Sequence, residues 1–157
     1  GHNIDPAEIE EALSGHPAVA VVGAIGQPDA RSGELPCAYV ELVAGAEASP
    51  AELIEFCRGR IHERAAIPKY IEVLDALPKT AVGKVFKPDL RKRAIRRIYD
   101  AALRDAGLPV HVEAVVDDKK LGLTAVLKRD GDVDAAALAH VLNQYTRPWR
   151  WHEDTPG

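Results

Sequence analysis

The sequence lacks methionine altogether, and aromatic residues make up only 5% of its 157 residues. A hydrophobic core must therefore be built mainly from alanine, valine, leucine and isoleucine. Cysteine is also scarce, with Cys37 and Cys57 as the two examples. Their spacing is not that of a metal site, so we expect two reduced, buried thiols of a cytoplasmic protein, with a single disulfide as the alternative.

Long apolar runs are absent as well. No stretch of about 18 apolar residues occurs, so no membrane-spanning helix is expected, and no signal peptide is recognised. The first residue is glycine rather than methionine, and we therefore expect a fragment of a longer protein. The net charge of -4 argues against a surface devoted to nucleic-acid binding.

What the sequence does contain is an ordinary globular composition, with 46% hydrophobic and 28% charged residues. Its first two thirds alternate between helix and strand patterns. Asp5 and Ser49 are natural N-caps, each followed by proline, and Gly15 can take the left-handed conformation that ends a helix. The expected elements are a helix at 6–14, strands at 18–25 and 36–43 around a loop at 26–34, a helix at 50–65, a short strand within 69–77 and a helix at 87–106.

The last third has a different pattern. Two strands, 110–117 and 121–128, flank a polar turn, and Asp132 or Asp134 can cap a helix at 135–145 before an irregular tail. The chain divides most naturally near Gly107. These patterns predict an α/β (α+β) fold, in which a small sheet is flanked by helices and a β-hairpin plus helix is appended at the C-terminus.

The loop at 77–85, LPKTAVGKV, separates the short strand from a strongly basic helix. Gly83 allows backbone angles that other residues avoid, and Lys84 follows it directly. A lysine ammonium is a compact charge that suits a phosphate or carboxylate oxygen. The alternative is a solvated surface lysine in a turn, which is the ordinary place for this residue type.

Two motifs together resemble the adenylate-forming superfamily, which includes acyl-CoA synthetases, luciferases and the adenylation domains of peptide synthetases. The family's pattern of Pro-Lys-Thr, two variable residues, Gly-Lys and an apolar residue matches at 78–85. The segment GHNIDPAEIEEALSGHPAVAVVGAIGQPD at 1–29 resembles the family's stretch beyond its interdomain hinge. The two motifs stand in the family's order and cover residues 1 to about 97.

The resemblance implies that residues 1–107 are the small, mobile C-terminal lid domain of an AMP-forming acid–CoA ligase, most like an acyl-CoA synthetase of fatty acid metabolism. The family's large N-terminal catalytic domain, with the ATP, Mg and acid sites, is absent from this chain, so the fragment alone is expected to be inactive. Its partners would be that domain, a small-molecule acid, ATP and CoA. Residues 108–157 are read as a strand–strand–helix extension beyond the family's usual end.

The resemblance also implies roles for individual residues. Lys84 is expected to be the catalytic lysine of adenylation, with Lys79 and Gly83 in support. Residues Gly1, His2 and Asn3 are expected to line the path of the pantetheine arm in a second pose. The Gly-His pair is similar to short-chain acyl-CoA synthetases, which favours CoA over a carrier protein as the acceptor.

The basic run from Lys84 to Arg97 contains one acidic residue, Asp89, and allows several readings. It can be a solvated helix face, or it can contact the phosphates of CoA, for which Arg91 is the candidate, or dock on the large domain. An alternative function is a module that engages a carrier protein or other acidic partner through this helix. Nucleic acid is not expected, because no aromatic platform interleaves the charges. No histidine stands at metal-ligand spacing, so no metal site is predicted.

Overall fold

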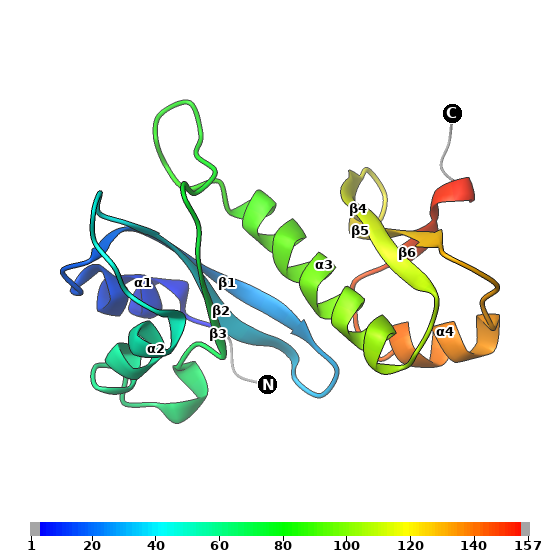
Figure 1. Ribbon diagram of the computed structural model, residues 1–157, viewed down its shortest axis with the longest axis horizontal. Helices are drawn as coiled ribbons and strands as arrows, with labels where there is room; N and C mark the ends of the chain where they lie inside the picture. The colour runs from blue at the N-terminus through cyan, green and yellow to red at the C-terminus, as the bar shows by residue number, and fades with distance from the viewer. Residues whose placement is uncertain (1–3, 155–157) are drawn as a thin grey trace. The chain divides into compact units, whose positions relative to one another are not determined.

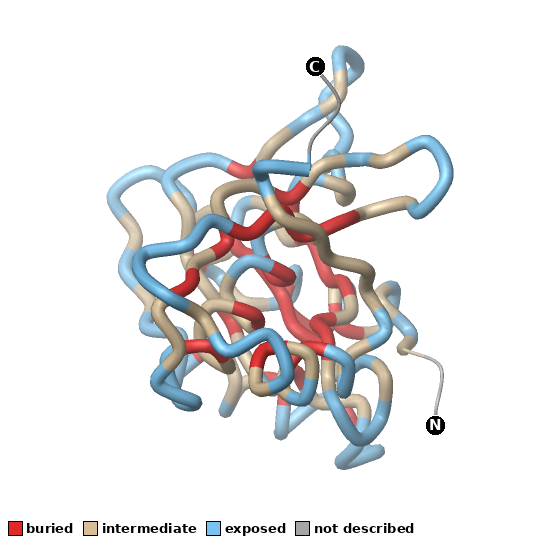
Figure 2. Tube along the Cα trace, turned by 90° about the vertical axis from the view of Figure 1, so that its right-hand side faces the viewer, coloured by how far each residue is buried: buried red, intermediate tan, exposed pale blue. Residues whose placement is uncertain are grey.

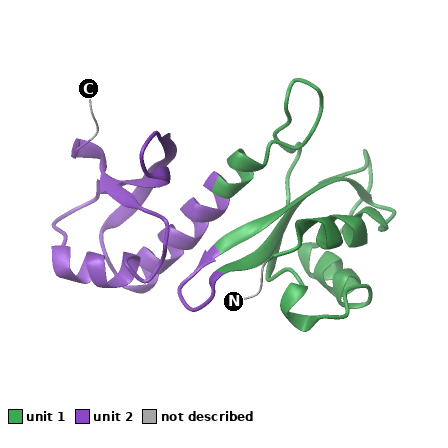
Figure 3. Cartoon of the chain, turned by 180° about the vertical axis from the view of Figure 1, so that it is seen from behind, with its two compact units in different colours: residues 1–27, 34–91 green, residues 28–33, 92–157 purple. Residues whose placement is uncertain are grey.

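A computed structural model describes residues 4–154 (Figure 1). The chain forms two compact units, each with its own hydrophobic core (Figure 3). The first contains the residues up to 27 together with 34–91, and the second contains 28–33 and the residues from 92 onward. The predicted division into a lid domain at 1–107 and an extension at 108–157 stays a prediction.

Helix α1 (Pro6–Ser14) opens the first unit and confirms the predicted N-cap. The Asp5 carboxylate accepts hydrogen bonds from the backbone amides of Ala7 and Glu8, at 3.1 and 3.4 Å. The prediction that Gly15 is left-handed is wrong: its φ is -76° and its conformation is right-handed. Its amide still donates to Ala12 O at 3.2 Å, so the helix closes through an ordinary final turn.

The first sheet has the order β1-β2-β3, formed by Val19–Asp29, Gly33–Leu42 and Tyr70–Val73. Strands β2 and β3 are parallel, with Cys37 opposite Tyr70. The loop predicted at 26–34 is wrong, because β1 and β2 extend to leave a turn at 30–32. The Asp29 carboxylate holds this turn by accepting from the amides of Arg31 (3.1 Å) and Ser32 (2.8 Å).

Helix α2 (Pro50–Arg58) begins as predicted, since Ser49 Oγ accepts from the Glu52 amide at 3.1 Å. It ends at Gly59 and not at 65, and a 3-10 turn, η1 (Arg64–Ala66), follows. Ile61 is buried although it lies outside the helix, because the amide of Ile61 still bonds to Cys57 O at 2.8 Å and keeps the chain against the core. The buried core of this unit consists of Ile9, Ala12, Leu13, Ala24, Ala38, Val40, Leu53, Cys57, Ile61 and Ile71.

Neither cysteine forms a disulfide, as predicted, and both are buried in this unit. Burial raises the pKa of the Cys57 thiol to about 11, so the thiol stays protonated at neutral pH.

Helix α3 (Lys87–Asp105) supplies residues to both units. Its predicted apolar line through Ile98 and Ala102 is shifted, since the fully buried positions after Leu90 are Ala94, Ile95, Tyr99 and Leu103. The helix ends in a Schellman motif around Gly107, whose φ is +69°. The Gly107 amide bonds to Arg104 O and the Leu108 amide to Leu103 O, at 2.9 and 3.0 Å.

The second unit contains a sheet of order β4-β5-β6. Strands β4 (Val110–Asp118) and β5 (Gly122–Arg129) form the predicted antiparallel hairpin, and Asp134 caps helix α4 (Ala135–Leu142). The prediction of an irregular tail is wrong, because β6 (Trp149–Trp151) pairs in parallel with β5 and the 3-10 turn η2 (His152–Asp154) follows it.

Two tryptophans explain why the tail becomes a strand. The Arg129 guanidinium lies 3.7 Å above the Trp151 ring, and Trp149 Nε1 donates to Asn143 Oδ1 at 2.9 Å. Both rings pack against the core of this unit. That core consists of Ile95, Tyr99, Leu103, Val110, Val112, Val115, Ala125, Leu127, Leu138 and Leu142.

Burial follows the regular elements, and the connecting turns are mostly exposed (Figure 2). Within residues 4–154, none of the helices has the length and apolar character needed to cross a membrane.

Candidate functional site

The segment 77–86, called the lysine loop below, connects β3 to α3 and extends away from the sheet of the first unit (Figure 1). Its two sides are joined at the base. Lys79 and Val85 form an isolated antiparallel bridge, and the Phe86 amide donates to Pro78 O at 2.8 Å. The lysine loop is therefore a closed structure with its own backbone hydrogen bonds.

Thr80 organises the tip of the lysine loop. Its amide donates to Lys84 O at 2.7 Å, and its hydroxyl oxygen accepts from the Lys84 amide at 3.2 Å. The Gly83 amide donates to Thr80 O at 2.9 Å. Gly83 has a φ of +85°, and an added Cβ atom would meet no atom within 4 Å. Glycine is therefore favoured at this position by its backbone angle and not by a close contact. The sequence reading treated Thr80 as merely small and missed this role.

The two lysines of the loop differ in their surroundings. Lys79 Nζ lies 2.7 Å from Glu41 Oε1 and 3.3 Å from Leu77 O, so its charge is neutralised within the unit. The side chain of Lys84 is exposed and has no hydrogen-bond or ion-pair partner among residues 4–154. A cation held on an ordered backbone without a counter-ion is suited to bind an external anion.

For the other predicted site residues the structure of residues 4–154 gives no contact that indicates a role. Arg91 lies in the second turn of α3, half-buried, with no ion pair in the described part of the chain. Predictions for Gly1, His2 and Asn3 fall outside the described residues. The proposed contacts of Lys79, Gly83 and Arg91 with substrate or CoA stay predictions. No group of three or more His, Cys, Asp or Glu side chains within 4–154 can hold a metal ion.

Several basic side chains of α3 form ion pairs or hydrogen bonds within the protein, which the sequence does not indicate. Lys87 Nζ lies 3.1 Å from Glu10 Oε2, and the Arg96 guanidinium donates to Glu113 O. Arg93 and Arg97 also have partners. Most of the basic side chains in this run therefore have partners within the protein and are less available to an external anion.

Glu41, which the sequence reading did not single out, controls the base of the lysine loop. Its Oε1 accepts from Lys79 Nζ at 2.7 Å and from the Leu77 amide at 2.9 Å. The bond from Lys79 and then the bond from Leu77 lower the pKa of this carboxyl below its usual value of 4.5. No local sequence signal points to Glu41, because its lysine partner is 38 positions away.

This lowered pKa predicts a dependence of stability on pH. The ionised Glu41 contributes its full stabilisation above pH 4.5, and that contribution disappears as the pH falls through the lower pKa of the folded state. The difference in free energy of unfolding between wild type and Glu41→Gln should therefore shrink below pH 4.5. Urea titrations of both proteins from pH 7 to pH 3 measure it, and a difference that stayed constant over this range would contradict the assignment.

The first unit is a small α/β domain whose loop between an edge strand and a long helix presents Lys84, a lysine without an ion pair among residues 4–154. Residues 8–84 match the AMP-binding enzyme C-terminal domain, so this part of the chain belongs to that family. The match ends at Lys84 and includes almost all of the first unit.

The named relatives include acid–CoA ligases and acyl-CoA synthetases. The chain is similar to marinolic acid–CoA ligase of Pseudoalteromonas sp. (strain SANK 73390), with 41% identity over 124 residues, or 78% of this chain and 19% of the relative. It is similar to acyl-CoA ligase lcsD of Purpureocillium lilacinum, with 36% identity over 143 residues, or 85% of this chain and 37% of the relative. The chain thus spans about a fifth to two fifths of these relatives.

A solved structure supports the same fold. The Mycobacterium tuberculosis fatty acyl CoA synthetase matches with a TM-score of 0.53 and 37% identity, over 58% of this chain and 18% of that one. The two curated matches also correct the expectation that the resemblance ends near residue 97. A match over 85% of the chain is more than residues 1–107 can supply, so the similarity continues into the second unit.

Proposed function

We propose that this chain is the mobile C-terminal domain of an AMP-forming acid–CoA ligase and that it supplies Lys84 to the adenylation step. The observation that carries the proposal is the contrast between the two loop lysines. Glu41 neutralises Lys79 at 2.7 Å, whereas the Lys84 ammonium is exposed and unpaired within residues 4–154. The loop is thus built to present one charge and to retain the other.

The chemistry of adenylation requires such a charge. A carboxylate oxygen of the acid attacks the α-phosphorus of ATP, the bond from that phosphorus to the bridging oxygen breaks, and pyrophosphate leaves with the electron pair. Because both reactants are anions, a cation that contacts both offsets their repulsion and holds them in line. Lys84 supplies that contact, and no proton has to move.

ATP and Mg²⁺ are assigned to the large domain of the full-length enzyme. Residues 4–154 of this chain contain no group of three or more His, Cys, Asp or Glu side chains that could hold a metal ion. In the second half-reaction a thiol that has lost its proton to solvent attacks the acyl carbon of the adenylate, the bond from that carbon to the phosphate oxygen breaks, and AMP leaves with the electron pair. Residues 1–3 are proposed to line the path of the pantetheine arm of CoA.

The alternative, a module that engages a carrier protein through the basic helix, has less support. Lys87 and Arg96 are engaged within the described chain, and Arg93 and Arg97 have partners. This leaves Arg91 and Lys92 as the cations at 87–97 without an ion pair among residues 4–154. Two half-buried cations are a small footprint for an acidic protein surface.

The test is acid-dependent release of pyrophosphate by the full-length protein, measured over a panel of short-chain, long-chain and aromatic acids. We expect release with at least one class of acid, followed by loss of free thiol when CoA is added. The isolated chain of 157 residues should release none. Absence of release with every acid, in a folded full-length protein, would contradict the proposal.

A further inference from the structure

We propose, building on the function inferred above, that Glu41 and Glu10 are positioning residues that hold the two ends of the lysine loop and so determine where Lys84 is presented. Each carboxylate uses a single oxygen to join a lysine of the loop region to a backbone amide of the first unit.

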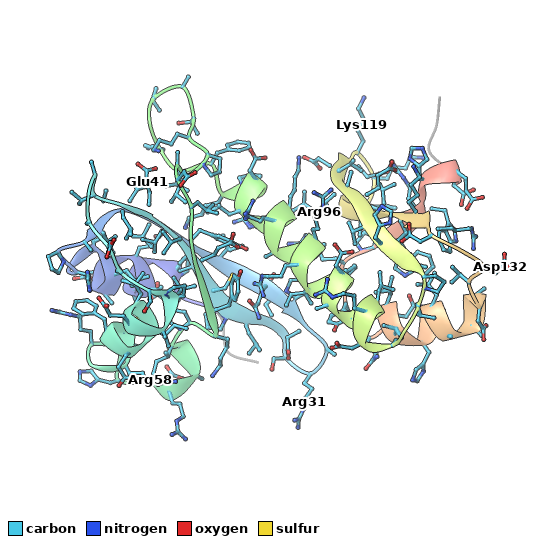
Figure 4. All side chains as sticks on the ribbon, in the orientation of Figure 1. Arg31, Glu41, Arg58, Arg96, Lys119 and Asp132 are labelled. Atoms are coloured by element: carbon cyan, nitrogen blue, oxygen red, sulfur yellow. The ribbon has the colours of Figure 1, made fainter. Side chains whose placement is uncertain are left out.

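Glu41 holds the end at which the chain enters the loop. It stands on β2, and its Oε1 receives both the Lys79 ammonium and the Leu77 amide. Figure 4 labels Glu41 at the base of the loop. The two side chains are partly shielded from water, with 33% of Lys79 and 22% of Glu41 exposed, so solvent screens this ion pair less than a fully exposed one.

Glu10 holds the end at which the chain leaves the loop. It stands on α1, and its Oε2 lies 3.1 Å from Lys87 Nζ and 3.1 Å from the amide of Ala24 on β1. The first turn of α3 is therefore tied to both α1 and β1. Because Lys87 follows Lys84 by three residues, this tie acts close to the exposed ammonium.

A close backbone approach reinforces this second tie. A Cβ atom added to Gly23 of β1 would lie 2.9 Å from Val85 Cγ1 and 2.6 Å from Leu90 Cδ1. Glycine thus lets the last part of the loop and the start of α3 lie directly on β1. Val85 is also the residue that pairs with Lys79 across the loop base, so the two tied ends are joined to each other.

Holding both ends matters because Lys84 itself has no partner in the described chain. A flexible side chain on a flexible loop would seldom place its ammonium between two reacting anions, and a misplacement of about 1 Å can cost roughly 10²-fold in rate. The two carboxylates confine the backbone, and the long side chain of Lys84 supplies the remaining reach.

The test uses Glu41→Gln and Glu10→Gln in the full-length enzyme. Glutamine keeps the size and the acceptor for the backbone amide but loses the charge. We expect each variant to lower the kcat of adenylation about tenfold, as befits loss of a charged hydrogen bond. KM for ATP and acid, and the rate of thioester formation from supplied acyl-adenylate, should stay unchanged.

Glu55→Gln is the control for loss of a carboxylate charge, because Glu55 forms an exposed ion pair with Arg58, at 2.8 Å, within α2 and apart from the loop. Its kcat should equal that of wild type. A charge exchange tests the pair directly: Glu41→Lys should lose activity, and adding Lys79→Glu should restore part of the lost kcat, because lysine at position 41 cannot accept from the Leu77 amide. This restoration separates a positioning role from a general effect on folding.

Three outcomes would overturn the inference: unchanged adenylation in both Gln variants, an equal fall in both half-reactions, or no restoration by the charge exchange. Failure of the proposed function is a separate outcome, and unchanged adenylation in Lys84→Ala would reveal it. If Lys84→Ala is inactive while Glu41→Gln and Glu10→Gln are fully active, the positioning role is rejected and the proposed function stands.

Discussion

Replacing Lys84 with alanine in the full-length enzyme is expected to lower the rate of adenylation by about 10²–10³-fold, which is the usual cost of losing one electrostatic contact to developing charge. The ammonium of Lys84 is exposed and makes no ion pair within residues 4–154, so its removal breaks no described contact of the fold. The loss should therefore appear in activity and not in stability. Acid-dependent pyrophosphate release measures the first, and thermal unfolding the second.

The two half-reactions provide the internal control for Lys84→Ala. Thioester formation from supplied acyl-adenylate should continue at the wild-type rate, because the lysine is proposed to act only in the first pose. Lys119→Ala is the matched control, since Lys119 is also an exposed lysine at a chain turn, between β4 and β5 (Figure 4). An unchanged adenylation rate in Lys84→Ala, or equal losses in both half-reactions, would reject the assigned role.

Replacing Leu127 with alanine is expected to lower the free energy of unfolding by about 2–5 kcal/mol. Leu127 is fully buried at the centre of the second core, where it lies opposite Val112 on β4 and Trp151 on β6. Removing its side chain leaves a cavity among well-packed neighbours that can collapse only partly. Urea unfolding of the 157-residue chain, followed by circular dichroism, gives the change from the shift in the midpoint.

Leu121→Ala is the control for this substitution. Leu121 lies in the β4–β5 turn with 56% of its surface exposed, so its truncation should change the free energy of unfolding by about 0.5 kcal/mol or less. Equal effects of the two variants would show that the second core does not stabilise the chain. Because the similarity to a relative extends past residue 107, the experiment also bears on the corresponding region of that relative.

Much of the fold was predictable because the relevant signals are local. Asp5 and Ser49 accept bonds from amides two or three positions ahead, so their caps depend on a few adjacent residues. The hairpin of the second unit was likewise predicted from alternating apolar residues around a polar turn, and the helix at 87–106 from its periodicity. The candidate lysine and its glycine were found the same way, from a motif of eight positions.

The error at the C-terminal tail arises because contacts between residues apart in sequence override local preference. The tail around Trp149 and Trp151 has no strand pattern of its own, and it becomes β6 because Arg129 and Asn143 hold the two rings. Helix α2 ends at Arg58 with Gly59 as its C-cap, and Ile61 is buried from the segment beyond the helix. The ring contacts that make the tail a strand cannot be read within a window of a few residues.

A small α/β domain with Lys84 on a glycine-containing loop could be predicted from the sequence, because caps, periodicity and the loop motif act over short distances. Which of the two loop lysines stays available depends on the folded structure. Glu41 is 38 positions from Lys79, and the packing of β2 beneath the loop brings them within 2.7 Å. Neutralising one lysine and leaving the other unpaired requires that long-range contact, and no local pattern specifies it.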